Sequence, residues 1–228
     1  MIPSKNIQKI KLVTFDAFGT ILHLSKPVPI VYSEVAQKYG VHATIDEIEH
    51  NSNKAFKDFS EKHKNHGKKS GLNPHDWWIK VIEHSFPTPV PAEMAEELWS
   101  YFSKKTGYTI HPLLIDFLKR NKEERKYIIG IISNTDERIR TVLEDYGIDH
   151  LIDIYAFSYD VGFEKPSREI FDYAMEKAVK LLGQEIQPEE CMHLGDDLIK
   201  DVSAARNIQW NAEYCDIKTN FLKYFEQK

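Results

Sequence analysis

The chain has 228 residues, of which 42% are hydrophobic and 29% are charged, so it is long enough for one large globular domain or a core with an insertion. Its formal net charge of −5 argues against a general nucleic-acid surface, which needs clustered cations. No stretch approaches the roughly 20 apolar residues that a membrane helix needs. We therefore expect neither a nucleic-acid nor a membrane partner.

Cysteine content and the N-terminal segment indicate the compartment. Cys191 and Cys215 are the two cysteines, and neither belongs to a C-x-x-C pair, which favours a reduced intracellular protein without structural disulfides. The start of the chain has neither the apolar core nor the small-residue cleavage site of a signal peptide. The cytoplasm is the expected location.

The N-terminal half begins with one buried strand and continues with helices. Residues 10–15 are apolar and partly β-branched, as in a strand that is buried on both faces. From about 28 to 105 the chain shows only helical periods. Thr44 followed by Glu47 predicts a capping box, and Asn73 followed by Pro74 predicts a second helix start. The helices expected in this block cover residues 29–39, 45–62, 74–86 and 92–105.

After residue 110, strand and helix patterns alternate. Strands are predicted at 127–133, 152–158, 191–195 and, weakly, 208–214, with helices at 112–124, 136–146, 167–182 and 198–206. Such alternation predicts right-handed βαβ units in a parallel sheet. The expected fold class is therefore α/β, with a doubly wound, Rossmann-like parallel sheet and an all-helical cap inserted after its first strand. The core domain is expected to cover 1–21 and 110–228, and the cap 22–109.

Polar residues gather where the strands of this core end. The group comprises Asp16, Ser133, Asn134, Lys165, Asp196, Asp197 and Asp201. In a doubly wound sheet the carboxyl ends of the strands form the binding crevice. Mg²⁺ prefers oxygen ligands and usually takes one or two carboxylates, which Asp16 and Asp196 could supply. A carboxylate can also attack phosphorus, while a hydroxyl and an ammonium hold the transferred group.

Four segments resemble the ordered motifs of the haloacid dehalogenase superfamily. They are FDAFGT (15–20), IISNT (131–135), EKP (164–166) and GDDLIKD (195–201), and their order, spacing and strand context match across nearly the whole chain. The resemblance implies Asp16 as the catalytic nucleophile, with Asp16, the Phe18 carbonyl and Asp196 as ligands of the cofactor Mg²⁺. It implies Ser133, Asn134 and Lys165 as substrate-binding residues, of which Ser133 and Lys165 also act in catalysis. Thr20 and Asp201 are then expected to hydrogen-bond to these groups and orient them without contacting the substrate or the ion themselves.

The resemblance also covers the insertion. Its segment GKKSGLNPHDWWIKVIEHSF (67–86) is similar to a eukaryotic subgroup of hydrolase-like proteins whose substrates are unassigned. A small phosphorylated metabolite is the implied partner. The sequence gives neither the identity of that substrate nor the oligomeric state.

Phe18 departs from the family pattern. Phosphatases of the superfamily carry a second aspartate at this position, which protonates the leaving group and then activates water. Loss of such an acid/base costs about 10²–10⁴-fold in rate. Three functions therefore stay open: a phosphatase-type hydrolase with weakened activity, a catalytically silent module that binds phosphate and Mg²⁺, and a 2-haloacid dehalogenase. The third is disfavoured for two reasons. Dehalogenases of the superfamily hold the leaving halide with an arginine of the cap, and residues 20–110 contain no arginine. Their fourth motif is neutral, whereas GDDLIKD is of the acidic, metal-binding type.

Two further features have more than one interpretation. Asp197 could be a third metal contact, or it could cap the helix that follows. The basic segment 62–69 (KHKNHGKK) contains His63 and His66, but it has no further ligand that would complete a zinc site, so we interpret it as a solvated loop. The same lysines could attract an anionic substrate or an acidic partner.

Overall fold

The computed structural model describes residues 9–225, and the chain divides into two compact units. One consists of Met1–His23 and Ile110–Lys228, and we refer to it as the sheet unit. The other, Leu24–Thr109, is the helical unit. The polar strand ends that the sequence analysis singles out all belong to the sheet unit.

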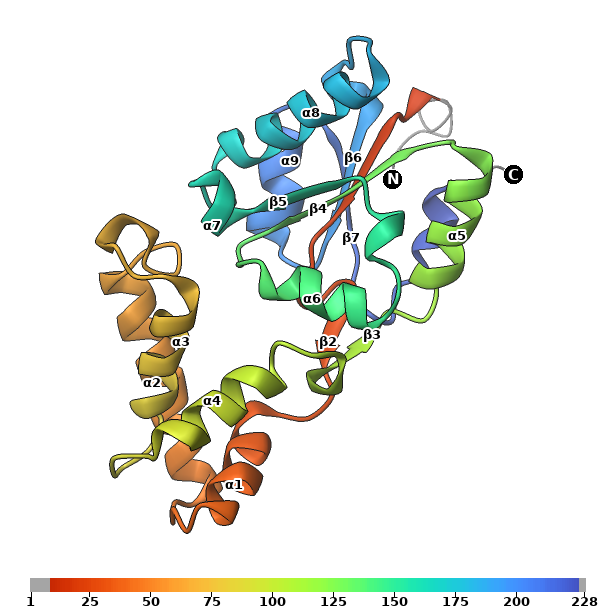
Figure 1. The fold of residues 1–228 in the computed structure, drawn as a ribbon. Coiled ribbons are helices and arrows are strands. Elements are labelled where there is room, and N and C mark those ends of the chain that lie inside the picture. The colour runs from red at the N-terminus through yellow and green to blue at the C-terminus, as the bar shows by residue number, and fades with distance from the viewer. Residues whose placement is uncertain (1–8, 226–228) are drawn as a thin grey trace. The chain divides into compact units, whose positions relative to one another are not determined.

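A five-stranded, fully parallel sheet forms the centre of the sheet unit (Figure 1). Its strand order is β5-β4-β1-β6-β7. The bounds are β1 Leu12–Phe15, β4 Ile128–Ser133, β5 Ile154–Phe157, β6 Cys191–Gly195 and β7 Asn211–Tyr214. The predicted doubly wound α/β fold is confirmed. The observed strands are mostly shorter than the predicted apolar runs, because a run can continue beyond the last ladder hydrogen bond.

Helices cover both faces of this sheet (Figure 1). α5 Leu114–Glu124 and α6 Arg138–Asp145 lie on one face, and α8 Arg168–Leu182 and α9 Ala204–Asn207 lie on the other. On the α5 side, Phe15 makes edge contacts with Phe117 and Phe221. On the α8 side, Phe171 and Trp210 join a buried apolar cluster that includes Leu12. The short helix α7 Ser158–Val161 was not predicted.

The pairing register fixes which residues meet at the end of the sheet. β1 lies between β4 and β6, with Phe15 opposite both Ile131 and Leu194. Asp16 and Asp196 therefore follow the carboxyl ends of β1 and β6, and Ser133 is the last residue of the neighbouring β4. The chain order reverses around β1, and such a switch point is where doubly wound sheets bind their ligands.

The helical unit contains four α-helices. They are α1 Val28–Lys38, α2 Ile45–Lys62, α3 Pro74–Glu83 and α4 Ala92–Tyr101. Both predicted helix starts are confirmed, because Thr44 and Glu47 form a capping box and the Asn73 side chain caps α3. α3 and α4 end before the predicted residues 86 and 105. The Ser85 hydroxyl donates to the Val81 carbonyl oxygen just beyond α3, and the chain after α4 continues as a separate 3₁₀ turn.

A two-stranded sheet of β2 Leu22–Leu24 and β3 Tyr108–Ile110 was not predicted, since three residues are too few to show alternation. The shorter helices are 3₁₀ turns at Lys68–Ser70, Lys105–Gly107, Asp149–Leu151, Pro188–Glu190 and Phe221–Tyr224, and a π-helix at Leu198–Ser203. Among residues 9–225, none of the helices has the length and hydropathy needed to span a membrane.

Candidate active site

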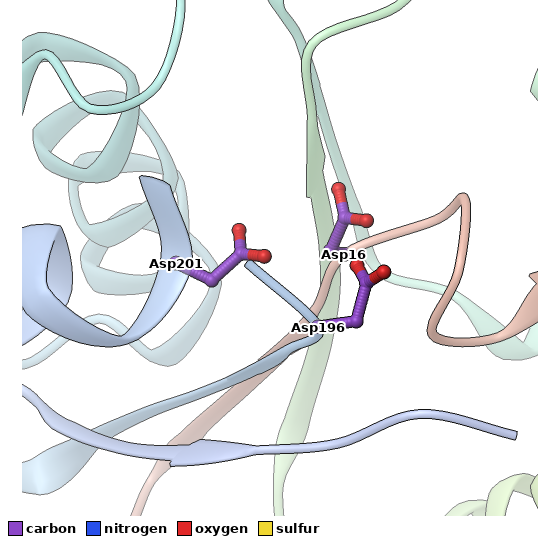
Figure 2. Close-up of side chains that lie close together, drawn as sticks. All are labelled: Asp16, Asp196 and Asp201. Carbon is purple, nitrogen blue, oxygen red and sulfur yellow. The ribbon is translucent and has the colours of Figure 1, made fainter. Parts of the chain in front are cut away.

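Three aspartates converge at the carboxyl end of the sheet (Figure 2). Asp16 follows β1, Asp196 follows β6, and Asp201 lies in the π-helix that comes next. One carboxylate oxygen from each lies within 4.8 Å of the other two. Asp16 and Asp201 are buried, while Asp196 is half-buried and accessible. The arrangement offers the hard oxygen ligands that a divalent cation prefers.

Backbone shape in the first motif makes room for Asp196. Gly19 has φ +84°, which a residue without Cβ adopts readily. A Cβ atom at this position would lie 2.0 Å from Asp196 Oδ2. The next residue, Thr20, is buried and donates from Oγ1 to Asp196 Oδ1 at 3.4 Å. The turn after β1 thus both admits and holds the accessible carboxylate.

Lys165 occupies the centre of the site. The residue is 4% exposed, and its Nζ donates to Asp16 Oδ1 at 2.6 Å, to Asp201 Oδ1 at 2.5 Å and to the Ile132 carbonyl oxygen at 2.8 Å. All three ammonium hydrogens are therefore used. A buried ammonium is tolerated only with such full pairing.

Asn134 holds the backbone that carries this lysine. Its Nδ2 donates to the Lys165 carbonyl oxygen at 2.9 Å, and its Oδ1 accepts from the Lys165 backbone N–H at 2.6 Å. The loop after β4 and the loop after β5 are therefore joined directly at the lysine. Both functional groups of the Asn134 amide make these bonds, and its role in substrate binding stays a prediction.

The charges of the cluster shift one another's pKa values. Burial raises the pKa of Asp16 and outweighs the opposing effect of Lys165. Burial, with the neighbouring charges of Asp16 and Asp201, also raises the pKa of Asp196. Burial acts to raise the pKa of Asp201 too, but hydrogen bonding to His193 and the charge of Lys165 hold it below its usual range. The cluster carries more negative charge than one lysine neutralises, which is what a cation site requires.

Ser133 and Phe18 complete the predicted set. Ser133 is buried at the end of β4, and its carbonyl oxygen accepts from the Thr135 backbone N–H at 2.9 Å. Phe18 is partly exposed in the turn after Asp16, where it forms a backbone bridge with Leu22. The structure therefore brings Asp16, Asp196, Asp201 and Lys165 into contact or near-contact, with Ser133 and Phe18 at the ends of the adjoining segments.

Asp197 caps the helix that follows it. Its Oδ1 accepts from the backbone N–H groups of Ile199 and Lys200, both at 2.8 Å. Its own backbone N–H donates to Asp201 Oδ2 at 3.0 Å. Gly195 allows Asp201 to come this close, since a Cβ atom there would lie 2.2 Å from Asp201 Cγ. The helix-capping interpretation of Asp197 is confirmed.

The sequence analysis did not single out His193 or Thr14, which adjoin this site inside the sheet. The two residues are paired across β1 and β6, and Thr14 Oγ1 lies 2.9 Å from His193 Nδ1. His193 Nε2 lies 3.1 Å from Asp201 Oδ1, within hydrogen-bond distance. Both residues are fully buried. The signal that could have found them is a polar residue in each of two otherwise apolar strands, because a buried polar group requires a partner.

Comparison with known proteins places most of the chain in one group. The model of a family described as haloacid dehalogenase-like hydrolases matches residues 10–209. An uncharacterized protein of Saccharomyces cerevisiae is 32% identical over 216 residues, which cover 90% of this chain and 71% of that protein. Haloacid dehalogenase-like hydrolase domain-containing protein 3 of Bos taurus is 26% identical, over 88% of this chain and 79% of its own.

A further relative and two solved structures are also similar. Glyceraldehyde 3-phosphate phosphatase of Methanopyrus kandleri is 26% identical over 86% of this chain and 79% of its own. The structure of a HAD phosphatase from Thermococcus onnurineus superposes with a TM-score of 0.56 at 24% identity, covering 89% of this chain and 85% of that one. Bacillus subtilis YfnB, solved with bound magnesium, has a TM-score of 0.65 at 14% identity and coverages of 89% and 87%. Both structures share the fold described above.

Proposed function

Because the chain belongs to the haloacid dehalogenase-like hydrolase family, we propose that it is a Mg²⁺-dependent hydrolase that acts on a small phosphorylated substrate through Asp16. The observation that carries this proposal is the position of Lys165, whose ammonium joins the Asp16 and Asp201 carboxylates while Asp196 remains accessible beside them. A phosphatase among the relatives supports the same reaction class.

The donor set fits a magnesium ion. Asp16 and Asp196 supply carboxylate oxygens, and their raised pKa values reflect burial and repulsion from neighbouring carboxylates, Asp201 in both cases, which a cation would relieve. We assign Asp16, Asp196 and the Phe18 carbonyl oxygen to the ion, with Thr20 and Asp201 orienting the groups around it. When bound, Mg²⁺ would offset negative charge on the oxygens of the phosphoryl group.

In the proposed reaction a carboxylate oxygen of Asp16 attacks phosphorus. A bond forms between that oxygen and phosphorus, and the bond to the leaving oxygen breaks, with the electron pair going to the leaving group. The Ser133 hydroxyl holds the transferred group, and the Lys165 ammonium, whose three hydrogens are bonded within the cluster, offsets its charge. Water then attacks phosphorus in the aspartyl phosphate, which releases phosphate and restores the Asp16 carboxylate.

Phe18 limits the substrates that this site can use. Its benzyl side chain supplies no proton to the leaving oxygen and no base for the attacking water. Aryl and acyl phosphates release stable anions and need little acid assistance, so we expect them to react faster than alkyl phosphates.

Two buried free cysteines fit a reducing compartment, which we propose is the cytoplasm.

Phe18 also favours a second candidate, a phosphate- and Mg²⁺-binding module without turnover. The two functions are separated by assaying aryl, acyl and alkyl phosphates with and without Mg²⁺, with Asp16→Asn as the blank. Asp172→Asn is a matched control, because Asp172 pairs with Arg168 on the surface of α8. Metal-dependent release of phosphate that Asp16→Asn abolishes supports the hydrolase. Phosphate binding without release on any substrate supports the binding module instead.

A further inference from the structure

His193 connects the buried sheet to the charged centre of the site. It lies in the middle of β6, fully buried, with the ring of Phe171 packed edge-to-face against it at 5.3 Å between centroids. Its two ring nitrogens face two different partners, the Thr14 hydroxyl and the Asp201 carboxylate. The imidazole is therefore held on both sides and from one face, so it has little freedom to turn.

The partners determine which nitrogen carries the proton. An ionised carboxylate only accepts, so Nε2 must donate to Asp201 Oδ1. Nδ1 of a neutral ring then has a free lone pair, which can accept from the Thr14 hydroxyl at 2.9 Å. The same hydroxyl lies 3.2 Å from the Met192 carbonyl oxygen, which is a longer alternative acceptor. The shorter contact favours the neutral tautomer with its proton on Nε2.

The Asp201 carboxylate, which His193 holds in place, in turn fixes the position of the Lys165 ammonium. The oxygen that accepts from His193 is Oδ1, and the same oxygen accepts from Lys165 Nζ at 2.5 Å. The other oxygen, Oδ2, accepts from the Asp197 backbone N–H. With both oxygens occupied, the Asp201 carboxylate has one orientation, and Lys165 Nζ is directed toward Asp16 Oδ1 at 2.6 Å.

We infer that His193 is a positioning residue, which uses its Nε2–H and the Thr14 hydroxyl to orient Asp201 and, through it, the ammonium of Lys165 at Asp16. The inference rests on the proposed function, because it assigns His193 a role in the reaction of that same site. A hydrogen-bonded chain thus runs from the interior of β1 through β6 and the π-helix to the nucleophile. Residues that orient a ligand of a reactive centre typically contribute 10–100-fold to affinity or activity.

The first test does not depend on activity. In protein labelled with ¹⁵N-histidine, the ring resonances of His193 are identified by their absence in His193→Gln. We expect a neutral ring protonated on Nε2, and Thr14→Val should weaken that preference. A neutral ring protonated on Nδ1 would overturn the inference, because Asp201 would then lack its donor.

The second test compares variants on p-nitrophenyl phosphate with Mg²⁺. His193→Phe keeps an aromatic ring but removes both hydrogen bonds, so kcat should fall about 10–100-fold, with a smaller change in KM. His193→Gln keeps an N–H near the position of Nε2 and should recover most of kcat. Exposed His150, changed to Gln, is the control. Undiminished kcat in His193→Phe, or equal losses in the Phe and Gln variants, would overturn the inference.

Two outcomes separate this inference from the proposed function. If the wild type releases no phosphate from any substrate, the proposed function fails, and the ring tautomer still reports on the positioning of Asp201. If the wild type is active and His193→Phe does not fold, Thr14→Val carries the test. A Thr14→Val protein with both wild-type kcat and the wild-type tautomer would contradict the inference.

Discussion

Gly19 and Asp196 approach each other so closely that a Cβ atom on residue 19 would lie 2.0 Å from Asp196 Oδ2. The two residues come from segments that are far apart in the chain, the turn after β1 and the end of β6. Glycine is therefore required at position 19 for two reasons. Its φ is positive, and the accessible Asp196 carboxylate occupies the space that a Cβ atom would need.

Gly19→Ala should therefore displace Asp196. A shift of about 1 Å in a catalytic group can cost about 10²-fold in rate, and Mg²⁺ affinity should fall with it. Gly40→Ala is the matched control, since Gly40 also has a positive φ, of +67°, but has nothing within 4 Å of the added Cβ. Both variants carry backbone strain of about 1–2 kcal/mol. Calorimetric titration with Mg²⁺ and phosphatase assays should separate them, and equal losses in both would contradict the steric explanation.

Lys165→Met should destabilise the protein in a pH-dependent manner. The variant leaves the Asp16 and Asp201 carboxylates buried without their cation, which costs about 3–5 kcal/mol at neutral pH. Lys165 helps to hold the pKa of Asp201 below its usual range. A carboxylate with a lowered pKa stabilises the fold above its ordinary pKa of 3.8, and this contribution is lost as the pH falls.

The deficit of Lys165→Met should consequently be largest near neutral pH and shrink as the pH falls below 3.8. Thermal unfolding measured at several pH values provides the test. Lys38→Met is the control, because Lys38 pairs with Glu97 on the surface and its removal should scarcely change Tm. A deficit that stays constant with pH would mean that lost packing, not charge, explains the change.

Phe18→Asp should restore acid/base catalysis. A carboxyl group two residues after Asp16 can protonate a leaving oxygen and then activate water, so we expect alkyl phosphate hydrolysis to rise about 10²-fold. Phe18→Asn is the control, because asparagine has nearly the same size as aspartate but transfers no proton, and it should give no such gain. Circular dichroism and Mg²⁺ titration check that both variants fold and bind the ion. A folded, Mg²⁺-binding Phe18→Asp without any gain would favour the binding module.

The capping box of α2 provides a prediction for the helical unit. Thr44→Ala removes the hydroxyl that accepts from the Glu47 backbone N–H and should cost about 1 kcal/mol of unfolding free energy.

The other half of the capping box gives a pH-dependent prediction. Hydrogen bonds from the Thr44 backbone N–H, the larger effect, and from the Thr44 hydroxyl lower the pKa of Glu47 from 4.5. The stability that this carboxylate contributes is present above pH 4.5 and lost as the pH falls. Glu47→Gln should then be less stable than wild type at pH 7, and the difference should narrow as the pH falls below 4.5, as measured by denaturant unfolding.

The sequence predicted the parts of the site that lie at strand ends. Asp16, Ser133 and Asp196 lie at the carboxyl ends of strands whose apolar runs are readable, and the parallel sheet brings those ends together. The two helix starts at Thr44 and Asn73 could also be predicted, because capping depends on residues three positions apart. Each of these features follows from local pattern combined with one topological rule.

The remaining features depend on register and on close approach. Thr14 meets His193 only because β1 and β6 pair with that register, and no local pattern encodes the pairing. The two bonds between Asn134 and the Lys165 backbone join loops that are separated by about thirty residues of sequence, so the amide could not be assigned from its motif alone. The segment Leu198–Ser203 is a π-helix, whereas an α-helix was predicted there. Over only six residues the periodicity of a π-helix is nearly the same as that of an α-helix, so the sequence does not distinguish them.

The central claim is that Asp16 accepts a phosphoryl group, and its most direct test is to trap that group. Protein mixed with Mg²⁺ and an aryl or acyl phosphate is quenched in acid within the first turnover, digested and analysed by mass spectrometry. Without an acid/base at position 18 the intermediate should break down slowly, so we predict phosphate on the Asp16 peptide of the wild type and of the Asp172→Asn control. Asp16→Asn should carry none. Release of phosphate by the wild type with no phosphorylated Asp16 peptide, or with an Asp16→Asn variant that is equally active, would contradict the account.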